Sequence, residues 1–275
     1  MDEPFGTRLQ KSIEARGRLC VGIDPHAALL EQWGLGDDAR GLESFAMTAV
    51  EALAGEVAVV KPQSAFFERH GSAGVAVLER VVRESRDAGA IVLLDVKRGD
   101  IGSTAAAYAD AYLHPESPIA CDAITVSPYL GFGSLDPFFD AAHRHGRGVF
   151  VLALTSNPEG PEVQHARVAG GSVAGSVLAQ VALRNRNVEP LGSVGAVVGA
   201  TIGDLAENLD VNGPLLVPGL GAQGGTPDDL RRLFEGVYVN VLPATARAVL
   251  AAGPDVTALR DAARRTAADT REIPG

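Results

Sequence analysis

The chain has 275 residues, 46% of them hydrophobic, and its 24 basic and 34 acidic residues give a formal net charge of −10. An acidic chain is poorly suited to coating nucleic acid or an anionic membrane, so neither is expected as a partner. The sequence shows no signal peptide and no apolar run near the roughly 20 residues that cross a bilayer, which predicts a soluble cytoplasmic protein. Cys20 and Cys121 each lie in an apolar run without a Cys-x-x-Cys pair, so we expect two reduced core thiols.

Short apolar runs recur along the chain, and runs of this length are typical of strands buried on both faces. There are eight of them, at residues 19–23, 57–61, 91–96, 119–126, 149–154, 194–198, 215–218 and 237–241. Longer segments with helical spacing lie between most of these runs, at residues 41–54, 73–82, 104–112, 135–145, 172–183, 227–234 and 245–250. Strands that alternate with helices predict βαβ units and a parallel sheet.

Eight such units in about 250 residues fit an α/β fold of the (β/α)8 TIM barrel type. A doubly wound open sheet is the structural alternative. Since no linker divides the chain, residues 1–275 are expected to form a single domain, with a polar C-terminal tail that frays from about residue 261. The longest irregular stretch, residues 155–171, follows the fifth predicted strand, and a loop of this length is usually functional, often a lid.

In a barrel the active site lies at the carboxyl ends of the strands. Five ionisable residues follow the first three predicted strands: Asp24, Lys61, Asp95, Lys97 and Asp100. Asp95 and Lys97 are two positions apart on a strand, so their side chains should share a face, and Asp100 follows a glycine that permits a turn. We expect a compact array in which carboxylates keep each lysine charged. The alternative is a structural salt-bridge network or a solvated loop, but buried charges are costly, and their concentration on adjacent strands favours function.

The loop after the seventh predicted strand is rich in glycine. Residues 219–225 contain four glycines, and Thr226 and Pro227 are typical of a helix N-cap and first helical residue. Phosphates in barrels are often held by the loops after strands 7 and 8, where Arg247 could add a bidentate contact. An ordinary turn is the alternative, but the position after the seventh of eight strands favours a phosphate site.

Four further polar residues near strand ends leave their roles open. Ser127 and Asn157 could contact a ligand or serve a turn or cap. His26 and His70 are interpreted as local structure, because no second type of metal ligand clusters with them at a recognisable spacing.

The sequence Asp95-x-Lys97-x-x-Asp100-Ile101-x-x-Thr104, with Lys61 upstream, resembles the Asp-x-Lys-x-x-Asp motif of orotidine 5'-phosphate decarboxylases. The resemblance extends over nearly the whole chain, and it is similar to the longer bacterial subgroup in residues 22–26, 61–68, 127–131 and 155–160. It implies a (β/α)8 homodimer that needs no cofactor and no metal. The reaction that it implies is the conversion of orotidine 5'-phosphate to uridine 5'-phosphate and carbon dioxide in de novo pyrimidine biosynthesis.

The resemblance also implies roles for individual residues. Catalysis would fall to a charged tetrad made of Lys61, Asp95, Lys97 and Asp100. Lys97 would protonate the ring carbanion, while Asp100, with the positions of Ile101 and Thr104, would reach into the site of the partner subunit. Substrate contacts would come from Asp24 at the ribose, Ser127 at the pyrimidine, Pro218, Gly219 and Gln223 on the phosphate side, and Arg247 at the phosphate. The residue before Arg247 is Ala246, where many members have serine.

Two other functions compete with this interpretation. Magnesium-dependent 3-keto-gulonate-6-phosphate decarboxylases and hexulose-phosphate synthases share the Asp-x-Lys element, but here the second strand ends in Lys61 rather than a carboxylate. A catalytically silent sugar-phosphate-binding barrel would not need lysines and aspartates in alternation. A fall in the orotate absorbance band on mixing with substrate, tested with and without a chelator, separates the three.

Overall fold

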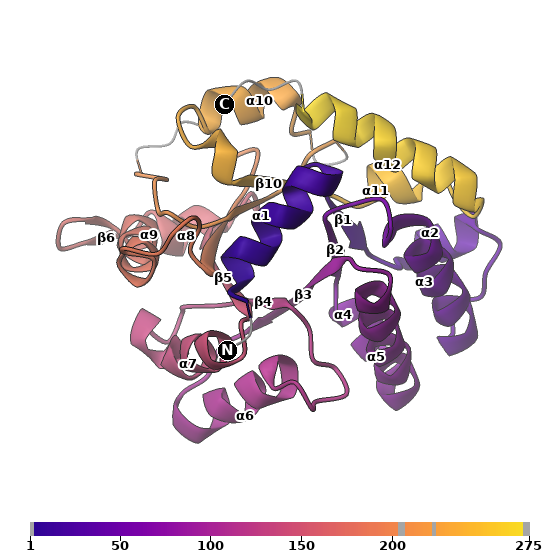
Figure 1. Ribbon diagram of the computed structural model, residues 1–275, viewed down its shortest axis with the longest axis horizontal. Coiled ribbons are helices and arrows are strands. Elements are labelled where there is room, and N and C mark those ends of the chain that lie inside the picture. Colours follow the sequence, from indigo (N-terminus) through magenta and orange to yellow (C-terminus); the bar gives the residue numbers. More distant parts are fainter. Residues whose placement is uncertain (1–2, 203–206, 222–223, 272–275) are drawn as a thin grey trace.

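The computed structural model describes residues 3–202, 207–221 and 224–271. Within these residues, eight parallel strands close into a barrel in the order β1-β10-β9-β8-β5-β4-β3-β2 (Figure 1). The barrel strands are β1 (Cys20–Ile23), β2 (Val59–Pro62), β3 (Ile91–Arg98), β4 (Ala123–Val126), β5 (Gly148–Leu154), β8 (Val194–Val198), β9 (Leu215–Pro218) and β10 (Val241–Thr245). A closed ring confirms the predicted (β/α)8 barrel and rules out the open doubly wound sheet.

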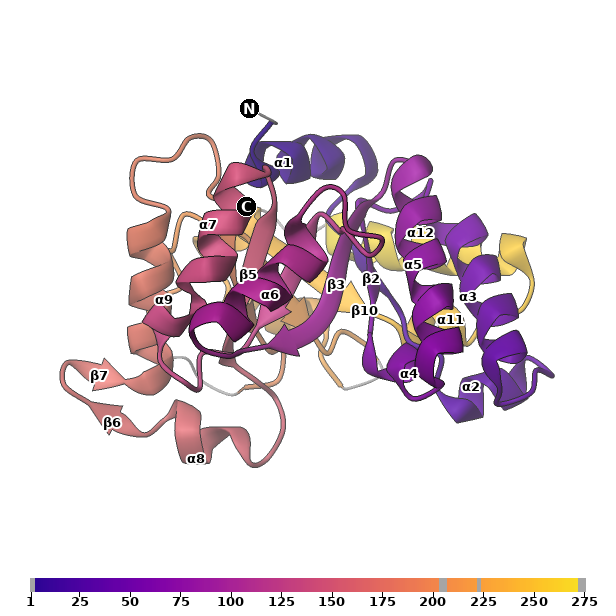
Figure 2. The same ribbon diagram turned by 90° about the horizontal axis from the view of Figure 1, so that it is seen from below.

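Helices surround the barrel (Figures 1 and 2). They are α1 (Phe5–Arg16), α2 (Ala27–Gln32), α3 (Ala39–Leu53), α4 (Ala65–Glu68), α5 (Gly71–Asp87), α6 (Gly102–Leu113), α7 (Asp136–Arg144), α8 (Gly160–Gln164), α9 (Val173–Arg184), α10 (Pro227–Leu233), α11 (Arg247–Leu250) and α12 (Val256–Arg271), with 3-10 turns η1 (Phe132–Leu135) and η2 (Tyr238–Asn240). None of the described helices is both long and apolar enough to cross a bilayer.

The half of the barrel interior nearest the amino ends of the strands is apolar. Interior side chains such as Leu93 and Phe150 form a buried cluster, and α1 closes this cluster with Phe5 and Leu9. Phe5 meets Phe150 edge-on, with 5.9 Å between the ring centroids. Figure 2 shows α1 at this end of the barrel and α8 at the opposite end. Helix α1 therefore covers the barrel interior at the amino ends of the strands, which leaves the carboxyl ends as the open side of that interior.

Charged side chains occupy the interior near the carboxyl ends of β2 and β3, and the strand period explains why. Side chains on one face of a strand recur every second residue. Val59 on β2 and Leu93 on β3 belong to the apolar cluster. The next interior positions toward the carboxyl ends of these strands are therefore Lys61 and Asp95. The charged groups therefore rest on a layer of hydrocarbon, which keeps water away from them on one side.

The last barrel strand was predicted at residues 237–241, and this prediction is wrong. Residues 238–240 form η2, and the strand runs from Val241 to Thr245. Tyr238 instead anchors the 3-10 turn, because its buried hydroxyl donates to the backbone oxygen of Thr270 at 2.9 Å. The strand contains Pro243, which lacks an amide donor, but β1 pairs only with the last two residues of β10. Because β10 ends at Thr245, Arg247 follows the end of the strand by two positions.

The C-terminal tail does not fray from residue 261 as predicted. Residues 256–271 form α12, which packs against α3 (Figure 1). Leu259, Ala262 and Ala263 are buried, and the guanidinium of Arg264 donates two hydrogen bonds to Glu56, at 2.9 and 3.0 Å. Because two of its four buried side chains in the described residues are alanines, the composition of this segment is polar although one face of it is apolar.

The segment 155–171 is not an irregular loop. It contains α8 and most of an antiparallel hairpin, β6 (Arg167–Val168) and β7 (Gly171–Ser172). The side-chain amide of Gln164 ties α8 to the barrel rim, since its oxygen accepts from the Thr155 amide at 2.9 Å and its nitrogen donates to the Thr155 hydroxyl at 2.6 Å. The segment therefore forms a structured cover beside the carboxyl ends of the strands.

Candidate active site

A cavity of about 300 Å³ opens at the carboxyl ends of the barrel strands. The charged residues in its described lining, apart from one histidine, are three cations and two carboxylates: Lys61, Lys97, Arg247, Asp24 and Asp95. The cavity therefore carries net positive charge, although the whole chain has a formal net charge of −10. This is the local reversal of charge that an anionic ligand requires.

Asp95 is the centre of the charged cluster. Its Oδ2 accepts hydrogen bonds from Lys61 Nζ at 3.0 Å and Gln63 Nε2 at 3.1 Å. Its Oδ1 accepts from Lys97 Nζ at 2.6 Å and from the Thr125 hydroxyl at 2.8 Å. Burial alone would raise the pKa of Asp95, but the two lysines outweigh burial and hold it well below its usual range. Asp95 is therefore ionised at neutral pH.

Lys61 is buried between two carboxylates, and its side chain is only 9% exposed. Burial opposes the charged ammonium, but the negative charges of Asp95 and Asp24 raise the pKa of Lys61 above its ordinary value. Removing either partner from a buried ion pair leaves an uncompensated charge, which is strongly destabilising. Lys61 and Asp95 therefore fix each other's protonation state.

Lys97 reaches the cavity by a different route from the one that its spacing predicts. Its φ is +45°, and the register of β3 against β4 shifts between Leu94 and Arg98. A left-handed conformation in a residue other than glycine costs on the order of 1–3 kcal/mol, so the surroundings must hold it. The Thr125 hydroxyl accepts the Lys97 amide at 3.0 Å, and Asp95 binds the ammonium. The side chain is 47% exposed, so a ligand can reach the ammonium.

Asp24 lies beside the cluster and carries an unused hydrogen-bond acceptor. Its Oδ1 is buried and has no hydrogen-bond partner in the described part of the chain. Burial raises the pKa of Asp24, while the charge of Lys61 acts to lower it. A buried oxygen without a donor is costly, and a hydroxyl of a bound ligand would supply the missing donor.

The opposite wall of the cavity comes from the ends of β9 and β10. Pro218, Gly219 and Arg247 line it, as predicted, whereas Gln223 lies outside the described residues. Gly219 has a φ of +108°, a conformation that glycine adopts without strain. The guanidinium of Arg247 makes no hydrogen bond or ion pair with the residues that the structure describes, so within them it is available to an anion.

The helix that follows the glycine-rich loop is capped by its own residues. The Thr226 hydroxyl accepts from the Asp229 amide, and the Asp229 carboxylate accepts from the Thr226 amide and hydroxyl. This confirms Thr226 and Pro227 as N-cap and first helical residue. It also places a carboxylate at the amino end of α10, so Arg247 and Gly219 are better placed than this helix to hold a phosphate.

Three predicted site residues lie away from this cavity. Asp100 was expected in the same array as the lysines, but its Oδ1 instead accepts the Ile101 amide at 2.8 Å and it does not line the cavity. The chain leaves the rim after Gly99, so α6 carries Thr104 to the outer surface, where it is exposed. Ser127 is half-buried, and its amide donates to the Arg98 carbonyl at 2.8 Å.

Several residues of the cavity were not among the candidates from the sequence. Gln63 and Thr125 both donate hydrogen bonds to Asp95. Strand periodicity could have identified them, because Gln63 lies two positions after Lys61 and Thr125 two positions before Ser127. His26 and Asn157, whose roles were open or assigned to local structure, also line the cavity. His70 does not belong to the cavity lining, and its imidazole lies 3.8 Å from Asp37.

The geometry defines a class of protein: a (β/α)8 barrel whose open end carries a lysine–aspartate cluster, in a cavity that Arg247 also lines. No three His, Cys, Asp or Glu side chains gather as a metal site within the described ranges. Residues 17–262 match the model of the orotidine 5'-phosphate decarboxylase / HUMPS family. The chain belongs to this family.

Individual relatives are similar over nearly their full length. Orotidine 5'-phosphate decarboxylase of Streptomyces coelicolor is 62% identical over 271 residues, which cover 98% of each chain. The enzyme of the same name from Nocardioides sp. is 65% identical over 268 residues, which cover 96% of this chain and 97% of that one. A crystal structure of a Streptomyces avermitilis protein that bears the same enzyme name has a TM-score of 0.97 and 60% identity, with 99% of this chain and 96% of that one covered.

Proposed function

We propose that this chain decarboxylates orotidine 5'-phosphate to uridine 5'-phosphate and carbon dioxide in pyrimidine biosynthesis, and that Lys97 protonates the ring. The relatives named above support the reaction. The observation that carries the mechanism is the cluster centred on Asp95, in which an accessible ammonium is held 2.6 Å from a carboxylate at the cavity wall.

The cluster suits a reaction that builds negative charge on carbon. When the bond to the carboxylate breaks, carbon dioxide leaves and the electron pair stays on the ring carbon. The Lys97 ammonium stabilises that charge as it develops and then transfers a proton to the same carbon. Asp95, kept ionised by Lys61, lies where the substrate carboxylate would approach, and the repulsion between them is relieved when neutral carbon dioxide departs.

The rest of the cavity matches the remaining groups of the substrate. The unused Oδ1 of Asp24 would accept a ribose hydroxyl. Arg247 and the backbone amide of Gly219 would hold the phosphate on the opposite wall, with Pro218 beside them. Contacts that lie far from the reacting carbon can supply binding energy that positions the ring against Lys97. A pyrimidine contact from Ser127 and a phosphate contact from Gln223 stay predictions.

We also propose a homodimer with shared sites. Asp100 and Thr104 lie outside the cavity of their own chain, which is the arrangement expected if they serve a partner. Large apolar side chains are also exposed after β3 and β4: Ile101, which follows Asp100, is 61% exposed, and Tyr129 and Leu130, shortly after β4, are 79% and 52% exposed. Burial of these side chains against a second copy would remove apolar surface from water. The cytoplasmic location likewise stays a prediction.

Lys97→Ala tests the catalytic assignment. We expect decarboxylation to be abolished, measured as the loss of orotidine 5'-phosphate absorbance, with the melting temperature little changed because Lys97 is half exposed. Arg40→Ala removes another exposed cation, which lies outside this cavity, and should retain full activity. Near-normal turnover by Lys97→Ala would refute the assignment, and wild-type activity that disappears with a chelator would favour a magnesium-dependent function instead.

Mixed dimers test the shared site. Asp95→Asn and Asp100→Asn subunits should each be inactive alone. If Asp95 acts in the site of its own subunit and Asp100 acts in the site of the partner, a hybrid dimer has one site that is wild type at both positions. Random exchange should then restore about a quarter of the wild-type activity, since half of the dimers are hybrids with one intact site each. Verified subunit exchange without recovery would count against the shared site.

A further inference from the structure

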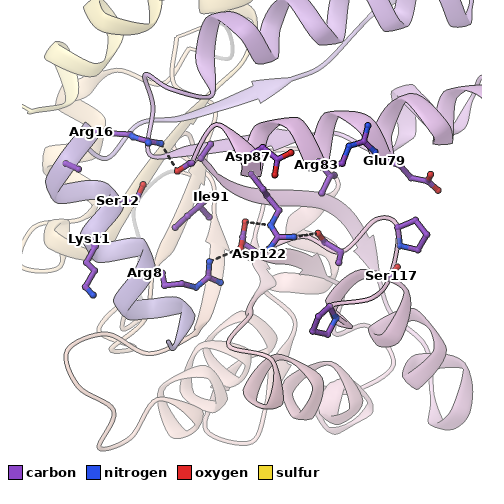
Figure 3. Close-up of a pocket in the computed structure, with 18 residues that line it drawn as sticks. Arg8, Lys11, Ser12, Arg16, Glu79, Arg83, Asp87, Ile91, Ser117 and Asp122 are labelled. Atoms are coloured by element: carbon purple, nitrogen blue, oxygen red, sulfur yellow. Dashed lines mark hydrogen bonds and ion pairs between the residues drawn. The ribbon is translucent and has the colours of Figure 1, made fainter. Parts of the chain in front are cut away.

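A second cavity, of about 780 Å³, lies at the other end of the barrel (Figure 3). We call it the basal cavity. Its walls are α1, α5 and residues 115–122, and its lining includes Ala90, Ile91 and Asp122, which lie at the amino ends of β3 and β4. It shares no lining residue with the cavity that contains Asp95 and Lys97. The decarboxylase mechanism therefore does not use it.

The basal cavity is rich in positive charge. Five cations and three carboxylates are present in its described lining: Arg8, Lys11, Arg16, Arg83, Arg86, Glu79, Asp87 and Asp122. Acidic residues outnumber basic ones in the chain as a whole, by 34 to 24. A local excess of cations in an acidic protein concentrates anions at that place.

The floor of the basal cavity shows the same imbalance at atomic distance. Three guanidinium groups among the described residues surround the buried carboxylate of Asp122, with Arg8 Nη1 at 2.8 Å, Arg147 Nη1 at 3.0 Å and Arg86 Nε at 3.5 Å. Figure 3 shows Arg8 and Asp122 pointing toward each other. Burial lowers the pKa of Arg147; the charge of Asp122 acts to raise it, and the positive charges of Arg86 and Arg8 act to lower it. One carboxylate cannot neutralise three guanidinium groups.

Neutral acceptors hold the other guanidinium contacts in place. Arg16 Nη1 donates to the carbonyl oxygens of Ala54 at 3.3 Å and Gly89 at 2.8 Å. Arg86 Nη1 donates to the Ala120 carbonyl at 3.1 Å. Arg16 and Arg86 lie in the last turns of α1 and α5, where a positive charge interacts favourably with the negative end of the helix dipole. The contacts of Arg16 are to neutral oxygens and leave its charge uncompensated within the described residues, whereas Arg86 shares the single carboxylate of Asp122 with Arg8 and Arg147.

We propose that the basal cavity binds the polyphosphate group of a nucleotide-sized metabolite. Guanidinium groups present paired donors that match phosphate oxygens. The volume of about 780 Å³ lies in the range of small-molecule sites and exceeds what a single inorganic anion fills. The phosphates lie against Arg8, Arg16 and Arg86, and Lys11 and Arg83 add charge from α1 and α5. This site is independent of the proposed decarboxylase activity.

Calorimetric titration with inorganic pyrophosphate tests the site. All variants carry Arg247→Ala, which removes the cation of the catalytic cavity that has no carboxylate partner among the described residues, and ionic strength is held constant. In this background we compare Lys11→Gln/Arg83→Gln with Arg40→Gln/Arg265→Gln, in which two exposed arginines outside the basal cavity are changed instead. Both double variants lose two positive charges and keep the Asp122 contacts, and thermal melts verify that each is folded.

The expected result is saturable binding of pyrophosphate that weakens by about tenfold in Lys11→Gln/Arg83→Gln, the loss expected for two exposed charge contacts. Binding by the Arg40→Gln/Arg265→Gln protein should equal that of the parent. Adenosine triphosphate should compete for the same site, which distinguishes a nucleotide site from one limited to the inorganic anion. Absence of saturable binding in the Arg247→Ala background, or equal weakening in both double variants, would overturn the proposal.

Discussion

The hydroxyl of Thr125 joins the two halves of the charged cluster, and its removal is the sharpest test of how the cluster is held. The side chain is buried, it donates to Asp95 Oδ1 at 2.8 Å, and it accepts the Lys97 amide at 3.0 Å. Thr125→Val keeps the shape of the side chain but removes both hydrogen bonds. The change therefore acts on polar contacts and does not open a cavity in the core.

The expected loss of stability follows from these two contacts. A hydrogen bond to a charged group contributes about 1.5–3 kcal/mol, and an amide left without an acceptor costs about 1–3 kcal/mol. Asp95 keeps Lys61, Gln63 and Lys97 as donors, so the lower part of each range applies. We expect the free energy of unfolding to fall by about 2–4 kcal/mol. A displacement of Lys97 by about 1 Å would also lower kcat by about 100-fold.

Urea unfolding and the absorbance assay measure these two effects. Thr125→Ser keeps the hydroxyl and should recover most of the activity. Thr245→Val is the matched control, because Thr245 is also buried in the cavity lining but donates only to the neutral carbonyl of Leu220 at 3.0 Å, a bond that contributes about 1 kcal/mol. If Thr125→Val were as stable and as active as Thr245→Val, the proposed positioning of Lys97 by Thr125 would be refuted.

Two further predictions concern titration and reactivity. Burial acts to raise the pKa of Asp95, but the two lysines lower it overall. The stabilising contribution of Asp95 is therefore fully present above the unfolded pKa of about 3.9 and is lost as the pH falls through the lower pKa of the folded state. The difference in unfolding free energy between wild type and Asp95→Asn should therefore stay level above about pH 5 and shrink in acid; a difference that stays constant to about pH 2 would contradict this. Burial raises the pKa of Cys20 and Cys121 to about 12, so iodoacetamide at about pH 8 should label the unfolded chain but not the folded one, as mass spectrometry would show.

The strand pattern was readable from the sequence because each barrel strand is a run of apolar residues with little else in it. Seven of the eight predicted runs overlap their strands closely within the described residues. The eighth failed because the run 237–241 is apolar for another reason, the burial of Tyr238 under α12. Helix α12 itself was missed because alanine contributes little to an apolar pattern although it packs closely. Helix α1 was missed because only a few of its residues, among them Phe5 and Leu9, are buried.

The site was predictable where its residues follow strands and less so where the backbone departs from regular geometry. Lys61, Asp95 and Asp24 come together because successive strands are neighbours in the barrel. The bulge that turns Lys97 inward leaves no simple trace in the sequence, since a lysine is not a residue that predicts a positive φ. The path of the chain after Gly99, which takes Asp100 away from the cavity, depends on where α6 begins.

The cluster is costly to maintain, which is itself an argument for function. Hydrophobic residues of similar volume often replace buried ion pairs without loss of stability. Here a carboxylate, a buried lysine and a backbone in a strained conformation are held together above a layer of hydrocarbon. The hydrocarbon lowers the local dielectric constant, which strengthens both the attraction within the cluster and the field that a ligand meets. Asp95 keeps Lys97 in position without neutralising Arg247, so the cavity stays positive toward a phosphate while presenting a negative charge to one end of the substrate. A barrel that only bound a sugar phosphate would need the positive charge in the cavity, but it would be more stable without the buried negative charge of Asp95.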